Sequence, residues 1–411
     1  MDIEDVRRRP LGSHPPMGER GEKTPARFAP SLGEARGSGT VVIAPDKFKG
    51  SLNALAVAEA IARGLRRSAP EVAAVLHPVA DGGDGFVAGL LHYGFRRRAA
   101  IVSDPLGRPI RAAYAIRQET AVIELAAASG MDLLTRSELD PLNCSTYGTG
   151  QLIAEAVAQG ARYVVMGAGG SATCDGGVGM LCALGARLLD PDGHPLPPEP
   201  ASLGRVDRVD LSGIAAAVRD ARIMVASDVT NSLLGNNGAI MVFGPQKGAV
   251  PEQLETLELR MQRWADAVER STGRHRRDHR GSGAAGGSSF ALASVFDAAI
   301  VPGIELFLDL SEFKQVLTDA RLVITGEGRL DEQTLGGKAP LGVCRSAARH
   351  GVRTVAVVGS TTLSAQQIRQ SGFAGVFTLE SVEADEQRSI RDAADLLSTV
   401  SSRLARHYLS N

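Results

Sequence analysis

The distribution of apolar positions predicts a strand, a helix and a second strand at the start of the folded chain. Residues 41–44 form an uninterrupted apolar run, which is typical of a strand buried on both faces. Apolar side chains then recur every fourth residue over 57–65, as on one face of a helix that Ser51 can cap. Residues 73–79 are predicted to be the second strand. This order is the opening of a doubly wound parallel sheet.

The same alternation returns near the C-terminus. Buried strands are predicted at residues 322–324, 354–358 and 374–378, and helices around residues 342–350 and near Gln366. The region before them has a different sequence pattern, in which glycine-rich turns separate short apolar runs. Both ends of the chain therefore favour one doubly wound sheet, with the middle folded separately.

We therefore predict an α/β protein of two α/β domains. One is discontinuous and combines residues 39–78 with residues 295–411, and residues 79–294 are inserted as the second domain. The clearest element of the insert is a helix near 251–271, whose regular apolar stripe indicates core packing. Residues 1–38 are rich in Arg, Pro, Gly and Glu and are predicted to be a disordered extension.

Composition narrows the function classes. The formal net charge is −1, which removes the broad positive field that nucleic-acid binding needs, and the basic run at 274–280 is interpreted as a solvated loop. No apolar stretch approaches the roughly 20 residues needed to span a bilayer, so no membrane partner is expected. The cysteines show neither a CxxC pair nor a zinc-ligand spacing, which favours reduced thiols in the cytoplasm. They are Cys144, Cys174, Cys182 and Cys344.

Two loops of the discontinuous domain carry residue types that suit phosphoryl transfer. That reaction needs donors for phosphate oxygens, carboxylates for Mg²⁺ and a group that orients the attacking hydroxyl. The first loop, from Asp46 to Ser51, follows a strand, where ligands of open α/β sheets gather. The second follows residues 322–324 and contains Glu327, Arg329, Asp331 and Lys338. A charged turn without a catalytic role is the alternative for each loop.

Further candidates lie in the inserted region. Asp81 and Asp84 are surrounded by glycines, in a backbone flexible enough to aim both carboxylates at one ion. Asp228 follows a predicted strand, and Lys247 lies between turn residues. Residues 281–287 are either a flexible linker or a backbone nest for anions, and taken alone they favour the linker.

The segment 167–177 follows a strand and leads into an Ala- and Leu-rich helix. Its glycines allow backbone amides to approach an anion at a helix N-terminus. The spacing G-x-G-x-x-A from Gly167, with Asp190 downstream, also mimics a dinucleotide fingerprint. Asp175 argues against that alternative, because a carboxylate in the loop would repel a pyrophosphate that lacks a metal.

These loops, in this order, resemble the bacterial type I glycerate kinase family. The matching stretches are 44–51, 80–85, 169–177, 228–231 with Gly235, 243–249, 284–287, and 324–331 with Lys338. The resemblance implies ATP-dependent phosphorylation of glycerate to 2-phosphoglycerate, with the active site in a cleft between a flavodoxin-like domain and a second α/β domain. The chain departs from the family at four positions. Lys47 and Cys174 stand where the family usually has Ser and Asn, and Asp84 and Ser232 stand where it usually has Glu and Pro.

On this resemblance each candidate has an expected role. Asp175 or Asp46 accepts or orients the proton of the glycerate hydroxyl. Some of the acids hold Mg²⁺, directly or through water, and the candidates are Asp81, Asp84, Asp228, Glu327 and Asp331. The triphosphate and the glycerate carboxylate are neutralised by Lys49, Lys247, Arg329 and Lys338. The ATP phosphates lie against Gly169, Gly170, Ser171, Thr173, Gly286 and Gly287.

Several alternatives stay open at this point. The acceptor can be the 3-hydroxyl of glycerate or the hydroxyl of a related small acid. A dehydrogenase would use the segment 167–177 for NAD, and a catalytically silent sensor would bind a hydroxy acid without turnover. We expect ATP and Mg²⁺ as cofactors, glycerate and ATP as partners and no nucleic acid, and we leave a homodimer open.

Overall fold

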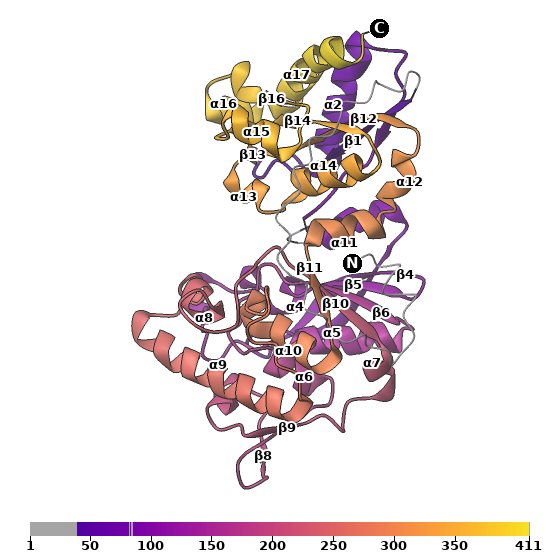
Figure 1. Cartoon of the computed structure of the whole chain (residues 1–411). Coiled ribbons are helices and arrows are strands. Elements are labelled where there is room, and N and C mark those ends of the chain that lie inside the picture. The colour runs from indigo at the N-terminus through magenta and orange to yellow at the C-terminus, as the bar shows by residue number, and fades with distance from the viewer. Residues whose placement is uncertain (1–38, 82, 84, 411) are drawn as a thin grey trace, which may run out of the picture. The chain divides into compact units, whose positions relative to one another are not determined.

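The computed structural model describes residues 39–81, 83 and 85–410, and the chain divides into two compact units (Figure 1). Unit 1 consists of the described residues up to Val79 and those from Leu308 onward, and unit 2 spans Ala80–Phe307. The second boundary lies later than the predicted one at 294/295, because strand β11 (Ala299–Val301) pairs with a strand of unit 2. The predicted extension, residues 1–38, lies outside the described residues, as does Asp84.

Unit 1 is built on a five-stranded parallel sheet. In space the strands run β16–β14–β12–β1–β2, which in chain order is the flavodoxin-like order 2-1-3-4-5. The strands are β1 (Thr40–Pro45), β2 (Ala74–Leu76), β12 (Ala320–Gly326), β14 (Arg353–Val358) and β16 (Gly375–Thr378). The predicted doubly wound parallel sheet is therefore confirmed.

Helices cover both faces of this sheet. Successive residues of β14 alternate between two apolar clusters, one formed with α2 (Ala54–Ser68) and α17 (Ala393–Tyr408), the other with α14 (Ala339–Arg349). This double cover explains why the strands are apolar without alternation. The remaining elements of unit 1 are α12 (Phe313–Leu317), β13 (Arg329–Leu330), α13 (Glu332–Leu335), β15 (Ser360–Thr361), α15 (Ala365–Ser371) and α16 (Glu386–Arg391).

Helix α2 shows how local sequence sets an element of unit 1. Its N-cap is Asn53, whose side chain accepts a hydrogen bond from Ala56 N at 2.9 Å, so the expectation that Ser51 caps the helix is wrong. Ser51 Oγ instead donates to a backbone carbonyl. Gly64 allows α17 to pack closely, since a Cβ there would lie 2.2 Å from Ser398 O.

Unit 2 contains a six-stranded mixed sheet in the order β11–β10–β6–β5–β4–β3. Strands β5, β6, β10 and β11 are parallel, and β3 and β4 extend one edge in antiparallel fashion. The further strands are β3 (Arg96–Ser103), β4 (Pro109–Arg117), β5 (Thr120–Glu124), β6 (Tyr163–Gly167) and β10 (Arg222–Ala226). The loops after the four parallel strands gather at one edge of the sheet.

Short helices and a small second sheet complete unit 2. The helices are α3 (Phe86–Leu90), α4 (Ala126–Ser129), α5 (Tyr147–Ala158), α6 (Val178–Ala183), α7 (Ala216–Asp220), α8 (Ala239–Phe243), α9 (Pro251–Thr272), α10 (Ser288–Phe296) and α11 (Gly303–Leu310), which crosses into unit 1. The second sheet is β8–β7–β9, with strands β7 (Arg187–Leu189), β8 (Pro195–Leu196) and β9 (Arg208–Asp210). Of the helices described, none is both long enough and apolar enough to cross a membrane.

The apolar stripe of α9 is core, as predicted. Leu257, Met261, Trp264 and Val268 are all buried in the main apolar cluster of unit 2. Trp264 also donates from Nε1 to Gly176 O at 2.9 Å. The helix therefore supports the loop after β6 from inside the protein.

Two segments of unit 2 differ from their predicted character. The basic run 274–280 is only partly solvated, because Arg277 pairs with Glu269 at 2.8 Å and with Asp266 at 2.6 Å. The glycine-rich segment 281–287 is fully buried, so the linker interpretation is wrong. Both segments pack against the core of unit 2.

Candidate active site

Asp46 follows strand β1 at the point where the strand order of unit 1 reverses. Such a switch point, with β2 on one side and β12 on the other, is where open α/β sheets bind ligands. Asp46 is 8% exposed, and its Oδ1 accepts a hydrogen bond from Lys47 N at 2.7 Å. Its own backbone N–H donates to Gly326 O at 2.8 Å, which ties the loop to the end of β12. The carboxylate is therefore held at the edge of the sheet where ligands are expected.

The loop after β12 lies against the Asp46 loop. A Cβ built on Gly328 would lie 3.7 Å from Lys49 N, so the two loops are in contact. Lys49 and Arg329 are exposed, and Lys338 is half-buried with its Nζ donating to Gln333 Oε1 at 3.0 Å. Unit 1 thus brings a carboxylate and several cations to adjoining loops.

Two acids of the loop after β12 make contacts within it. Asp331 caps α13, since its Oδ1 accepts from Gln333 N at 2.9 Å and from Thr334 N at 3.2 Å. Glu327 Oε1 accepts from Thr334 Oγ1 at 2.5 Å. A capping carboxylate maintains the shape of its loop, so this geometry favours Glu327 over Asp331 as a metal ligand.

In unit 2 the two glycine-rich loops meet. A Cβ built on Gly169 would lie 3.2 Å from Gly83 Cα, so the loop after β6 is in contact with the Asp81 loop. Gly169 and Gly170 are exposed, and Asp81 is half-buried with Oδ1 accepting from Gly83 N at 3.3 Å. These loops form an accessible part of the carboxyl edge of the sheet.

Glu124 is a candidate that sequence reasoning missed. It ends β5, pairs in register with Gly167 of β6, and accepts a hydrogen bond at Oε1 from Val87 N at 2.8 Å. The signal was available, because Glu124 follows the apolar run 121–123 just as Asp46 follows an apolar strand. Glu124 therefore lies between the two glycine-rich loops.

Lys247 lies inside unit 2, against the loop after β6. It is 3% exposed, and its Nζ donates to Ser171 Oγ at 2.7 Å and to Thr173 O at 2.8 Å. Burial lowers the pKa of the Lys247 ammonium. Ser171 and Thr173 are buried as well. The arrangement favours internal support of the loop over direct contact with a dissolved ligand.

Asp175 is fully buried and held by four hydrogen bonds. Oδ2 accepts from Thr146 N at 2.9 Å, from Thr146 Oγ1 at 2.7 Å and from Gly179 N at 3.2 Å, and Oδ1 accepts from Gly177 N at 3.1 Å. Burial raises the pKa of Asp175, and the hydrogen bonds oppose that rise. Such a carboxylate connects the loop to α5 and α6, so a structural role suits it better than proton acceptance.

Gly286 and Gly287 are buried against the same loop. Gly176 N donates to Gly286 O at 2.9 Å, and a Cβ on Gly286 would lie 1.9 Å from Thr173 O. Both glycines have positive φ values, +61° and +91°. Close approach to the loop therefore accounts for glycine here without a bound anion.

Asp228 is exposed after β10 at the carboxyl edge of the unit 2 sheet. Its Oδ1 accepts from Gly303 N at 3.0 Å, at the start of α11. The described acids of unit 2 that follow parallel strands, Asp228 and Glu124, thus both contact helix starts. Each retains the position expected of a ligand-binding carboxylate.

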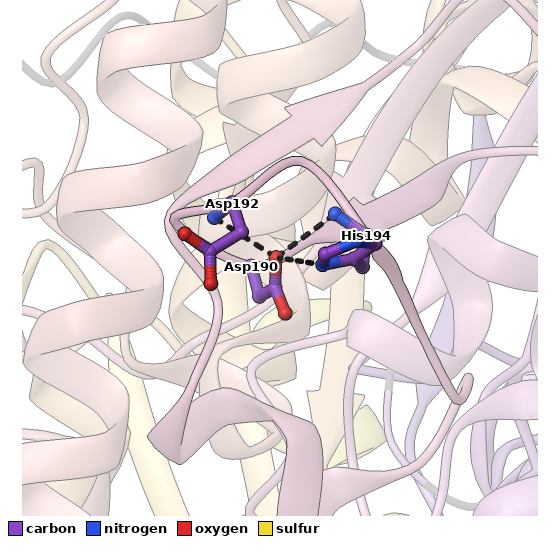
Figure 2. Close-up of side chains that lie close together, drawn as sticks. All are labelled: Asp190, Asp192 and His194. Atoms are coloured by element: carbon purple, nitrogen blue, oxygen red, sulfur yellow. Dashed lines mark hydrogen bonds and ion pairs between the residues drawn. The ribbon is translucent and has the colours of Figure 1, made fainter.

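Asp190 lies in the hairpin between β7 and β8, where Figure 2 shows it beside Asp192 and His194. Its Oδ1 accepts from Asp192 N at 3.0 Å and from His194 N at 2.9 Å, which is the chemistry of a turn. In addition, α6 begins at Val178, six residues after Ala172 of the G-x-G-x-x-A spacing. A dinucleotide fingerprint needs its helix directly after the glycines, so the geometry contradicts the NAD alternative.

A family model described as the glycerate kinase family matches residues 41–409. The chain belongs to the glycerate kinase family. Glycerate kinase of Bacillus subtilis is 42% identical over 342 residues, which are 82% of this chain and 90% of that protein. Glycerate 2-kinase of Escherichia coli is 38% identical over 369 residues, 89% of this chain and 97% of that protein.

A solved structure supports the same conclusion. A crystal structure whose description names glycerate kinase 2 from Salmonella typhimurium LT2 has a TM-score of 0.79 and 38% identity, and covers 90% of this chain and 98% of that one. Membership of the glycerate kinase family makes this chain an enzyme, a phosphotransferase, as predicted. ATP use is the ordinary property of such a family.

The candidate carboxylates fit Mg²⁺ by their chemistry. Mg²⁺ prefers hard oxygen ligands and takes only one or two protein carboxylates. Unit 1 offers Glu327, and unit 2 offers Asp81, Glu124 and Asp228, all half-buried or exposed. His77, which follows β2, and Cys174 are buried, so the accessible donors of these loops are carboxylates. The donor set is therefore suited to a hard cation.

Proposed function

We propose that this enzyme transfers the γ-phosphoryl group of ATP to the 2-hydroxyl of glycerate and forms 2-phosphoglycerate. The observation that carries the proposal is the carboxylate of Asp46 at the switch point of the unit 1 sheet, with Lys49 and Arg329 in the adjoining loops. The relative named glycerate 2-kinase supports the position of transfer.

Asp46 is the group that orients the attacking hydroxyl and takes its proton. Phosphoryl transfer has a loose transition state that asks little of a base, so a carboxylate held in place suffices. The hydrogen bond from Lys47 N to Oδ1 fixes this carboxyl group at the end of β1. Among the predicted bases, Asp46 replaces Asp175 as the preferred candidate.

The cations of unit 1 neutralise the anionic reactants. Lys49 and Arg329 are exposed and Lys338 is half-buried, and an ammonium or guanidinium close to a developing phosphate charge stabilises the transition state. The carboxylates of Glu327 in unit 1 or of Asp81, Glu124 and Asp228 in unit 2 would hold Mg²⁺, which would supply charge neutralisation for the phosphate oxygens.

Unit 2 contributes the exposed glycines of the loop after β6. Gly169 and Gly170 present their backbone to phosphate oxygens, and Lys247 and Asp175 keep that backbone in shape from inside. The buried Ser171 and Thr173 serve the same support. The proposed phosphate contacts of unit 2 are therefore made by main chain.

The test is a purified-protein assay with ATP, Mg²⁺ and either enantiomer of glycerate. ADP release and phosphorus and carbon NMR of the product are measured. The proposal predicts 2-phosphoglycerate from D-glycerate. Formation of 3-phosphoglycerate would overturn the position of transfer, and ADP release only with another hydroxy acid would overturn the substrate.

We further propose a cytoplasmic location, which the four free cysteines and the need for ATP support. The product would enter carbohydrate catabolism as a phosphorylated three-carbon acid. A homodimer remains a prediction, and light scattering on the purified protein decides it.

A further inference from the structure

Strands β3 and β4 form a hollow of about 570 Å³ at one side of the unit 2 sheet. Its lining consists of Arg97, Arg98, Ala99, Arg111 and Ala113. In the antiparallel register Ala99 is opposite Ala113, and Ile101 is opposite Arg111. Alternate residues of paired strands share a face, so Arg97 and Arg111 lie at the two ends of an alanine floor. Four residues along the strand separate them by about 13 Å.

Within the described part of the chain, the arginines of the hollow have no carboxylate partner. Several other arginines of unit 2 do form such ion pairs, namely Arg108, Arg162, Arg187, Arg205, Arg270, Arg276 and Arg277. No described carboxylate forms an ion pair with Arg97, Arg98 or Arg111, and all three are exposed. Three neighbouring cations of this kind attract anions.

Protection of the sheet edge does not account for the arrangement. Charged residues on an edge strand prevent pairing with another chain, and Arg97 and Arg98 of β3 can serve in that way. Arg111 cannot, because it belongs to the inner strand β4. Ile101, 70% exposed on β3, also leaves this edge poorly protected. A shared ligand explains arginines from both strands.

The hollow lies in line with the candidate active site of unit 2. Ala115 of β4 is opposite Val122 of β5. When this antiparallel register is continued by two residues, Ala113 is opposite Glu124. Glu124 pairs with Gly167 of β6. The alanine floor and the loop after β6 are therefore separated by two to three strand spacings, about 10–14 Å. The hollow is a separate site on the same row of the sheet.

We propose that this hollow binds a small organic polyanion that carries two anionic groups, phosphate or carboxylate. Two guanidinium groups from opposite ends can each make a bidentate contact with one anionic group. The small floor residues leave room for the carbon skeleton, and the volume is that of a metabolite site. Binding needs neither ATP nor glycerate, so the proposal stands independently of the proposed reaction.

The test compares pyrophosphate and citrate binding by isothermal titration calorimetry at low ionic strength. Wild-type protein is compared with the Arg97→Gln/Arg111→Gln variant and with the matched control Arg63→Gln/Arg219→Gln, which removes two exposed arginines elsewhere. Glutamine retains polarity and most of the length, and equal melting temperatures confirm that all three proteins are folded. Pyrophosphate also suits the candidate active site, so the number of sites is measured as well as the affinity.

We expect wild type and control to bind one more pyrophosphate per chain than the hollow variant, or to bind it at least about tenfold more tightly. If the hollow variant also loses citrate binding, carboxylates are ligands of the site. If it loses pyrophosphate binding but binds citrate as the wild type does, the site is restricted to phosphates. Equal stoichiometry and affinity in all three proteins would overturn the proposal. Tighter binding of a short DNA duplex at the hollow than of either small anion would also overturn the proposal.

Discussion

Units 1 and 2 place similar residues after parallel strands, yet the environments differ. In unit 1 Lys49 and Arg329 are exposed beside Asp46 at the edge of the sheet. In unit 2 Lys247 and Asp175 are buried and hydrogen-bonded to the protein itself. The comparison teaches that the position of a residue after a strand does not show whether its side chain contacts a ligand or stabilises a loop. Exposure separates the cations, because Lys49 and Arg329 are exposed and Lys247 is buried.

The largest stability effect is expected at Gly286. In Gly286→Ala the new Cβ would lie 1.9 Å from Thr173 O at a φ of +61°, so the loop after β6 must move. Urea unfolding should show a loss of about 3 kcal/mol or more. The control Gly273→Ala has a similar φ of +69° but no atom within 4 Å, and should lose about 1 kcal/mol. Equal losses of stability in the two variants would contradict the close packing of Gly286 against Thr173.

Lys247→Met tests whether the buried lysine supports the loop. Ser171 Oγ and Thr173 O would lose a buried donor, at a cost of about 2–4 kcal/mol in unfolding free energy. Activity should fall together with stability, since the exposed glycines shift. The control Lys314→Met, at an exposed lysine, should change neither quantity by much. A stable Lys247→Met enzyme whose only defect is a raised KM for ATP would show that Lys247 binds the nucleotide directly.

His77 makes unit 1 sensitive to acid. The ring is buried, bonds Ser311 Oγ at 2.9 Å, and burial lowers its pKa to about 4. The unfolded chain binds the proton near pH 6.5, so acid favours unfolding, and stability should fall by about 2 kcal/mol from about pH 7.5 to about pH 5. In His77→Gln this part of the pH dependence should disappear from urea unfolding curves. An unchanged pH profile would contradict the assignment.

The smallest stability effect is expected at Asp331. Its variants test whether this residue caps a helix or binds the metal. As a helix cap, Asp331→Ala should cost about 1 kcal/mol, whereas Asp331→Ser should retain most of the stability. The Mg²⁺ concentration for half-maximal activity should be the same in both variants. A rise of tenfold or more in both would make Asp331 a metal ligand instead.

Much of unit 1 follows from its sequence. Apolar runs without alternation predicted its strands and the doubly wound sheet, whereas the flavodoxin-like strand order was implied by the family resemblance. The Asp46 and Glu327 loops were found because polar residues directly follow those runs. Local pattern is informative here because the proposed site residues are adjacent in sequence to buried strands.

Unit 2 was harder to predict, for physical reasons. Nothing local shows that Lys247 reaches Ser171, 76 residues away in the chain, or that 281–287 is buried. A glycine-rich run has the same composition whether it is solvated or packed against another backbone. Glu124 was not predicted, although its position after an apolar run carries the same signal as that of Asp46.

The most direct test measures Asp46→Asn and Asp175→Asn together, for kcat and for the free energy of unfolding. The account predicts that Asp46→Asn lowers kcat by about a thousandfold with nearly unchanged stability. Asp175→Asn should lose about 3 kcal/mol of stability, because its four hydrogen bonds are buried. An active Asp46→Asn enzyme beside a stable but inactive Asp175→Asn enzyme would contradict the account and return the base to unit 2.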